Sequence, residues 1–177
     1  MKKPALKKLK LIINYAVSPI VIDADGINLL SCNIDILKRA KTPIILTPHP
    51  AEMSRICGKS VSEINANRVI VAADFAKKHG VYLVLKGNET VIAAPDGRVN
   101  INPTGNAGMA TGGSGDVLSG IIAGLLAYNT DVFDAVTKAV YIHGLAGDIS
   151  AEKLSQTSVL PSDIIKELPC VFKTLEG

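Results

Sequence analysis

Three short apolar runs constrain the fold of this chain more than any other feature of its sequence. They are 19–23 (Pro-Ile-Val-Ile-Asp), 43–47 (Pro-Ile-Ile-Leu-Thr) and 81–85 (Val-Tyr-Leu-Val-Leu). Each run is unbroken rather than alternating, which is typical of a strand that is buried on both faces. Helical segments separate the runs, and this order predicts an α/β fold with a parallel sheet and helices on its faces.

Capping and turn signals place the remaining elements. Ser60 and Glu63 form a capping-box pattern at the start of a helix predicted over 60–79. Residues 90–94 and 98–102 flank an Asp-Gly turn, which predicts a β-hairpin. No internal repeat or second domain is indicated, so we expect one domain over 1–177. Further helices are predicted over 5–16, over 117–127, over 132–153 with a break near 144–147, and over a short stretch from 161.

Composition excludes several classes of protein. The net charge of +3 arises from five lysines among the first ten residues, and no basic stripe with interleaved aromatic residues predicts nucleic-acid binding. Cys32, Cys57 and Cys170 are odd in number and lack metal-ligand spacing, which favours reduced thiols and a cytoplasmic location. No signal-peptide pattern follows Lys2 and Lys3, and the longest apolar stretch is too short to span a membrane.

Polar side chains gather where the three apolar runs end. Asp23 and Asp25 follow the first run, 49–52 follows the second, and Lys86 with Gly87 follows the third. In open parallel sheets, ligands bind beyond the carboxyl ends of the strands. The pattern therefore predicts a ligand site at this edge of the sheet.

The sharpest chemical signal is Asn106–Asp116, whose sequence Asn-Ala-Gly-Met-Ala-Thr-Gly-Gly-Ser-Gly-Asp leads directly into an apolar helix. Glycines let backbone N–H groups converge on an anion, and the dipole of the following helix favours negative charge at the same place. Asp116 is placed to accept a proton from an attacking hydroxyl. The segment is neither a Walker A loop nor a dinucleotide-binding GxGxxG. The alternative is a flexible loop in which Asp116 is an ordinary N-cap.

This segment resembles the signature of the NAD(P)H-hydrate dehydratases, carbohydrate-kinase-like enzymes of the ribokinase-like superfamily. The resemblance extends over about residues 19–168 and includes four further blocks: 21–28 (VIDADGIN), 47–53 (TPHPAEM), 85–90 (LKGNET) and 139–148 (AVYIHGLAGD). It implies a three-layer fold with a mostly parallel sheet and helices on both faces. Ala51 stands where the family usually has Gly, and Ser114 stands where Thr is common.

Family domains begin roughly a third earlier than this chain. The resemblance therefore implies an N-terminally truncated, partial catalytic domain. Removing strands from a parallel sheet exposes apolar faces and an unpaired edge. We consequently expect a homo-oligomer or an N-terminal partner chain.

The resemblance also implies roles for individual residues. Asp116 would be the catalytic base and would contact the substrate. The anion hole would be formed by Gly112, Gly113, Ser114 and Gly115, together with Asn106. The nucleotide would contact Lys86, Gly87, Asn88, Glu89, Thr90 and Gly115. The substrate would contact His49 and Glu52, and the pocket would be lined by Asp23, Asp25 and Asn28, which are also candidates to hold Mg²⁺ through water.

The implied reaction repairs hydrated NADH and NADPH (NADHX and NADPHX), with ADP or ATP as co-substrate and Mg²⁺ as cofactor. Phosphorylation of the ring hydroxyl and elimination of phosphate would restore the ring. Two alternatives remain open: a small-molecule kinase acting on a hydroxymethylpyrimidine, thiazole or sugar, and an inactive nucleotide-binding fragment or subunit of a split enzyme. The residues do not distinguish ADP from ATP.

Structural roles for some of these residues also remain open. Asp23 could bind loop amides, His49 could be a turn histidine, and Lys86 could be a solvated lysine at a strand end. We expect His143, which lies within an apolar helix, to be packed and hydrogen-bonded.

Overall fold

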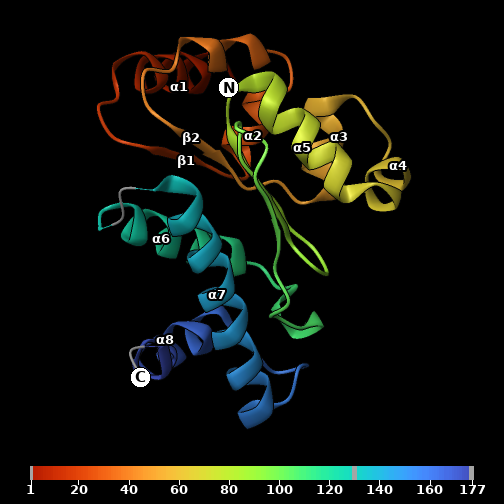
Figure 1. The fold of residues 1–177 in the computed structure, drawn as a ribbon, viewed down its shortest axis with the longest axis vertical. Helices are drawn as coiled ribbons and strands as arrows, with labels where there is room; N and C mark the ends of the chain where they lie inside the picture. The colour runs from red at the N-terminus through yellow and green to blue at the C-terminus, as the bar shows by residue number, and fades with distance from the viewer. Residues whose placement is uncertain (1, 129–130, 176–177) are drawn as a thin grey trace. The chain divides into compact units, whose positions relative to one another are not determined.

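The computed structural model of this protein describes residues 2–128 and 131–175, which form two compact units (Figure 1). Unit 1 comprises Met1–Gly87 and Val91–Ile101, and unit 2 comprises Asn88–Thr90 and Asn102–Gly177. The expectation of one domain over the whole chain stays a prediction.

Unit 1 contains a five-stranded sheet in the order β1-β2-β3-β4-β5. The three apolar runs form the parallel strands β1 (Ile20–Ile22), β2 (Ile44–Leu46) and β3 (Tyr82–Leu85), as predicted. The predicted hairpin is also confirmed: β4 (Val91–Ala93) and β5 (Val99–Ile101) are antiparallel, and β4 pairs antiparallel with β3. The sheet is thus mixed, because a tight hairpin can only join antiparallel strands.

The helices of unit 1 lie between and before the parallel strands. Capping by Ser60 and Glu63 is confirmed, but the single helix predicted over 60–79 is wrong, because Asn67 leaves the helical region at φ −139° and ψ 42°. Gly80, at φ 66°, ends the second of the two resulting helices. The helical elements are α1 (Lys2–Tyr15), α2 (Asp25–Leu30), the 3-10 helix η1 (Ile34–Arg39), α3 (Pro50–Cys57), α4 (Val61–Ala66) and α5 (Arg68–His79).

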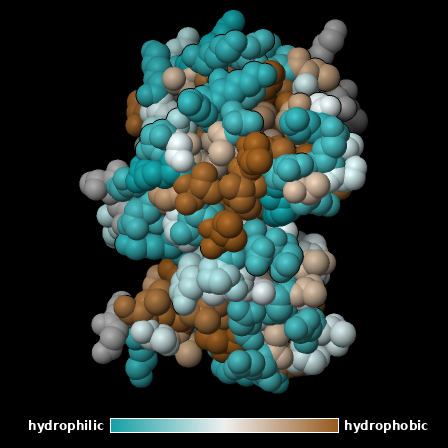
Figure 2. Space-filling view, turned by 45° about the vertical axis from the view of Figure 1, so that its right-hand side comes forward, coloured by the Kyte–Doolittle hydropathy of each residue, from teal (hydrophilic) through white to brown (hydrophobic). Residues whose placement is uncertain are grey.

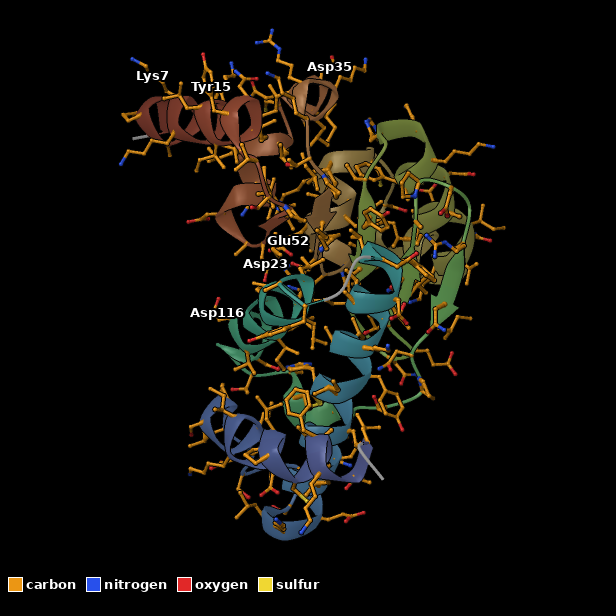
Figure 3. All side chains as sticks on the ribbon, turned by 60° about the vertical axis from the view of Figure 1, so that its left-hand side comes forward. Lys7, Tyr15, Asp23, Asp35, Glu52 and Asp116 are labelled. Carbon is orange, nitrogen blue, oxygen red and sulfur yellow. The ribbon has the colours of Figure 1, made fainter. Side chains whose placement is uncertain are left out.

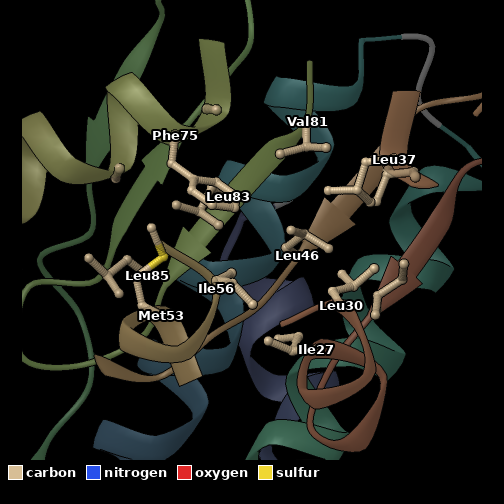
Figure 4. Packing of buried hydrophobic residues seen from close by; sticks show 14 of the residues in the cluster. Ile27, Leu30, Leu37, Leu46, Met53, Ile56, Phe75, Val81, Leu83 and Leu85 are labelled. Carbon is tan, nitrogen blue, oxygen red and sulfur yellow. The ribbon is translucent and has the colours of Figure 1, made fainter. Parts of the chain in front are cut away.

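The core of unit 1 lies between the sheet and these helices (Figure 4). Alternate strand residues such as Leu46, Leu83 and Leu85 contribute to it, as expected from the two-residue period of a strand. Met53 from α3 and Phe75 from α5 pack against them. Burial of this aliphatic cluster fixes where each parallel strand ends, and therefore where the polar residues that follow it are placed.

Unit 2 contains the 3-10 helix η2 (Ala107–Met109) and the helices α6 (Ser114–Leu126), α7 (Val132–Leu154) and α8 (Pro161–Leu175). α7 packs against both α6 and α8. The break predicted near 144–147 is wrong, since α7 is continuous there and its glycines instead admit neighbouring residues closely. α8 has 15 residues and is longer than predicted. Within the described ranges, no helix is long and apolar enough to cross a membrane.

Candidate functional site

An ion pair joins the ends of two strands in unit 1. Lys86 Nζ lies 2.9 Å from Asp23 Oδ1, and these side chains are only 22% and 14% exposed. The amide of Ala24 donates to the same oxygen at 2.8 Å. Burial alone would raise the pKa of Asp23, but the Lys86 ammonium and the Ala24 amide outweigh it and hold the pKa below its usual value. Asp23 is therefore anionic and holds the Lys86 ammonium at the strand ends.

The turn after Lys86 is supported by a residue that sequence reasoning missed. Arg68, at the start of α5, donates from Nη2 to the carbonyl of Leu85 at 2.8 Å. A Cβ on Gly87 would lie 2.9 Å from either terminal nitrogen of Arg68, so glycine is needed for this close approach. Gly87 belongs to unit 1 and Asn88–Thr90 to unit 2. Nucleotide contacts from the segment 86–90 stay a prediction.

His49 and Glu52 form a capping box at the start of α3 (Figure 3 labels Glu52). His49 Nδ1 accepts from the amides of Ala51 at 3.1 Å and Glu52 at 3.3 Å. The His49 amide in turn donates to Glu52 Oε2 at 2.9 Å. These bonds satisfy helix donors that would otherwise lack partners. The side chain of His49 is still 48% exposed, so substrate contact stays a prediction beside this structural role.

The other predicted pocket residues of unit 1 differ in their surroundings. Asp25 is exposed in the first turn of α2. Asn28 Oδ1 accepts from Arg55 Nη1 at 2.9 Å, which ties α2 to α3. No group of three His, Cys, Asp or Glu residues in the described part of the chain is arranged to hold a metal ion.

Unit 2 carries the glycine-rich segment, and its last residues open α6 (Figure 3 labels Asp116). The N-cap of α6 is Gly113, at φ 96°, and no side chain caps the helix. Glycine is required for this left-handed conformation. An uncapped helix start presents N–H groups and a positive dipole end, which together suit an anion. Asp116 is an exposed residue in the first turn rather than the N-cap, so the alternative reading of Asp116 as an ordinary cap is wrong.

Residues 104–109, which include the start of this segment, form hydrogen bonds with α7. Asn106 Nδ2 donates to Asp148 Oδ1 at 2.8 Å and to the Gly147 carbonyl at 3.1 Å, and Asn106 Oδ1 accepts from Gly108 at 3.0 Å. Both amide hydrogens of Asn106 are thus engaged within the protein. Its predicted contact with phosphate stays a prediction, whereas Asp148 had not been singled out for any role.

His143 has the packed, hydrogen-bonded position that the sequence predicts. It is buried in α7, and its Nε2 lies 3.3 Å from Ser114 Oγ at the start of α6. Ser114 is itself buried, so its hydroxyl faces α7 while Gly112 and Gly113 are exposed. The Ser114 hydroxyl is therefore turned away from a ligand at the loop, and its N–H donates to the Thr111 carbonyl at 3.3 Å.

An apolar groove of about 640 Å³ runs along α6 and α8 in unit 2. Figure 2 shows apolar side chains gathered at the height of α8. Asp116 lies at the start of the α6 wall and is the charged residue of the lining. The groove, hereafter the α6–α8 groove, is lined mainly by Val117, Gly120, Ile121, Gly124 and Leu125 of α6 and by Ile165, Leu168 and Phe172 of α8.

Parallel strands followed by helices, in a mixed sheet with a carboxylate and a lysine at the strand ends, define an α/β protein. The fold is ribokinase-like. Within that class, the sequence profile of the NAD(P)H-hydrate dehydratases matches residues 2–170, and this chain belongs to that family.

Individual relatives agree with this assignment. The bifunctional NAD(P)H-hydrate repair enzyme of Moorella thermoacetica is 46% identical over 158 residues, which are 89% of this chain and 30% of that protein. The ADP-dependent (S)-NAD(P)H-hydrate dehydratase of Bacillus subtilis is 38% identical over 89% of this chain and 55% of its own length. A crystal structure of the Bacillus subtilis ADP/ATP-dependent dehydratase, co-crystallized with ATP/Mg²⁺ and soaked with CoA, superposes with a TM-score of 0.87 at 35% identity, covering 98% of this chain and 62% of that one. The chain thus spans between 30% and 62% of the length of these relatives.

Proposed function

We propose that this chain carries the catalytic part of a nucleotide-dependent NAD(P)H-hydrate dehydratase. The observation that carries the proposal is the glycine loop leading to the uncapped start of α6, with Asp116 exposed in the first helical turn. Membership of the family and the names of its relatives support the same substrate class.

In the proposed reaction, Asp116 and the backbone N–H groups of the glycine loop each have one role. Asp116 takes the proton from the hydroxyl of the hydrated nicotinamide ring, and the hydroxyl oxygen bonds to the terminal phosphorus of the nucleotide. The bond from that phosphorus to the nucleotide's bridging oxygen breaks at the same time. Backbone N–H groups of Gly112–Gly115 stabilise the charge on the phosphoryl oxygens. The C–O bond then breaks with the ring nitrogen supplying electrons, so phosphate leaves in place of hydroxide, which is a poor leaving group.

Mg²⁺ fits this assignment as a partner of the nucleotide. When bound, it offsets the negative charge of the phosphates. Mg²⁺ usually keeps several waters and takes few protein ligands, so no dedicated group of three carboxylates is required. Asp25 is exposed and could contact the hydrated ion, whereas Asp23 is already committed to Lys86.

The direct test mixes the purified chain with hydrated NADH, Mg²⁺ and either ADP or ATP, and follows the absorbance of the reduced nicotinamide ring. A rise that depends on nucleotide supports the proposal and identifies the co-substrate. No rise, beside an active full-length relative, contradicts it for this chain. A stable phosphorylated product without a rise would instead indicate a small-molecule kinase.

We also propose that the α6–α8 groove is covered by another polypeptide segment in the active protein. The groove is apolar, and the matched relatives contain a large portion that has no counterpart in these 177 residues. The proposed occupant is an equivalent of that portion. Light scattering of the chain, alone and with the non-matching portion of the Bacillus subtilis protein, tests this. A 1:1 complex that Leu168→Asp abolishes supports it, a self-associated chain indicates a second copy instead, and a monomer that binds nothing contradicts it.

A cytoplasmic location is proposed on the state of the cysteines. Cys32, Cys57 and Cys170 are all free thiols. Free thiols are typical of reducing compartments. Fluorescence of a tagged chain in intact cells checks this proposal.

A further inference from the structure

We propose that one face of α7, formed by His143, Gly144, Gly147 and Asp148 and called here the loop-holding face, positions the glycine loop for phosphate. Asp148 is its principal positioning residue. The identity of the ligand rests on the proposed function, whereas the contacts of the loop-holding face do not. The four residues are spaced so that they share one side of the helix.

Asp148 holds the beginning of the loop with both of its carboxylate oxygens. Oδ2 accepts from the backbone N–H of Gly105 at 2.8 Å, and Oδ1 accepts from Asn106 Nδ2 at 2.8 Å. Asn106 in turn positions Gly108, because Asn106 Oδ1 accepts from the N–H of Gly108 at 3.0 Å. Hydrogen bonds to an ionised group are stronger than neutral ones. One carboxylate thereby constrains Gly105 directly and Gly108 through Asn106.

The glycines of the loop-holding face bring the loop close to the helix. A Cβ on Gly144 would lie 2.2 Å from Thr104 Oγ1 and 2.7 Å from its backbone carbon. Likewise, a Cβ on Gly147 would lie 2.2 Å from the sulfur of Met109. Thr104 Oγ1 is also within 3.0 Å of the Tyr141 carbonyl on the same helix. The loop therefore packs directly on the α7 backbone rather than on a layer of side chains.

His143 holds the other end of the loop. Its imidazole Nε2 lies 3.3 Å from Ser114 Oγ, and both residues are buried. The loop is thus attached to α7 near its start, through Asp148, and at its end, through His143. Between these attachments lie Gly112 and Gly113, whose exposed backbone forms the proposed anion hole.

These attachments matter because glycine-rich chain is costly to order. Glycine loses more conformational freedom on ordering than any other residue. An anion hole is effective only when its N–H groups already point at the ligand. Both carboxylate oxygens of Asp148 already accept from donors within the protein, so the side chain is unsuited to contact phosphate itself. Its contribution is to order the loop before the nucleotide arrives.

The test compares Asp148→Asn with Glu152→Gln, a control with the same change of charge at an exposed site one turn further along α7. Two readouts are used: amide hydrogen exchange over 104–109, and calorimetric binding of Mg-ADP and Mg-ATP. Asp148→Asn should speed exchange at Gly105 and Gly108 by about tenfold or more and weaken nucleotide binding by a similar factor. Its melting temperature should remain close to that of the wild type. Glu152→Gln should change neither readout.

A second variant provides rescue. In Asp148→Asn the new amide group places a donor opposite the donor of Asn106. Adding Asn106→Asp restores an acceptor there and keeps the partner of the Gly108 N–H, but it removes the donor to the Gly147 carbonyl. The double variant should therefore recover part of the exchange protection at Gly108. Unchanged exchange in Asp148→Asn would overturn the proposal. If the wild-type chain binds no nucleotide, the proposed function fails, while the exchange data still decide the role of Asp148.

Discussion

The two units present candidate site residues in opposite ways. In unit 1 the candidate ligands hold each other, through the Lys86–Asp23 pair and through the box of His49 and Glu52. In unit 2 the groups proposed to bind the ligand are backbone N–H groups of a loop, and hydrogen bonds from residues of α7 position that loop. A substitution in unit 1 therefore changes structure and ligand together, whereas unit 2 allows the two to be separated.

This difference follows from the kind of group that each unit offers. A charged side chain at a strand end needs a partner once it is largely buried, and here the partner comes from the end of another strand of the same sheet. The glycines of the loop have no side chains of their own, so the loop is ordered by contacts of Asn106 and by residues of α7. Substitutions in each unit can therefore separate structural support from ligand contact.

Asp116→Asn removes the proposed base from unit 2 without touching the contacts that order the loop. Turnover should fall by about 10²–10⁴-fold, the usual contribution of general base catalysis. Nucleotide binding should be retained, because the backbone N–H groups are unchanged. Initial rates of ring restoration and calorimetric affinity measure the two effects. Wild-type turnover in the variant would remove Asp116 from the mechanism.

Gly144→Ala tests close packing of the loop on α7. The added methyl group would meet the backbone of Thr104, which cannot swing aside, so we expect a loss of about 3 kcal/mol in the free energy of unfolding. Gly124→Ala is the matched control, since nothing lies within 4 Å of a Cβ there and α6 should gain about 0.5–1 kcal/mol. Urea denaturation measures the free energy of unfolding of both variants. Equal values would contradict close packing of Thr104 on Gly144.

Lys86→Met tests the ion pair of unit 1. It leaves the carboxylate of Asp23 largely buried without its cation, so the pKa of Asp23 should rise and stability at neutral pH should fall by about 1–3 kcal/mol. Lys138→Met serves as a control, since its pair with Asp134 is exposed and should be worth less than about 0.5 kcal/mol.

The pH dependence of this effect has a definite sign. The pKa of folded Asp23 is depressed, so its stabilising contribution is present above the unfolded value of about 3.9 and is lost as pH falls through the folded value. The difference between wild type and Lys86→Met should therefore shrink as the solution is acidified, first through the raised pKa of Asp23 in the variant and then through its depressed pKa in the wild type. Urea denaturation across this range provides the check, and a difference independent of pH would exclude the ion pair as its cause.

His49→Ala and His49→Ser separate capping from substrate contact. Alanine removes the acceptor for two helix amides and should lower the free energy of unfolding by about 1 kcal/mol, whereas serine should keep most of the cap. If His49 also contacts the substrate, both variants should raise KM for the hydrated dinucleotide. A normal KM in the serine variant would leave His49 with a purely structural role.

The sequence by itself determined the parts of this protein that depend on local pattern. The apolar runs, the Asp-Gly turn and the capping box of Ser60 and Glu63 are each decided by neighbouring residues, and each was found where it was predicted. The residues of Asn106–Asp116 likewise predicted a glycine loop followed by a helix, because glycine spacing and helix periodicity are both local properties.

Only the tertiary structure decided how those parts are held. Lys86 pairs with Asp23, and Asp148 bonds to Gly105, although the residues of each pair lie far apart in the sequence. α7 also continues through Gly144 and Gly147, where another segment packs against the helix. A glycine inside a helix predicts a break when the chain is considered alone. It permits close packing when another segment lies against it, and no local pattern states which segment that is.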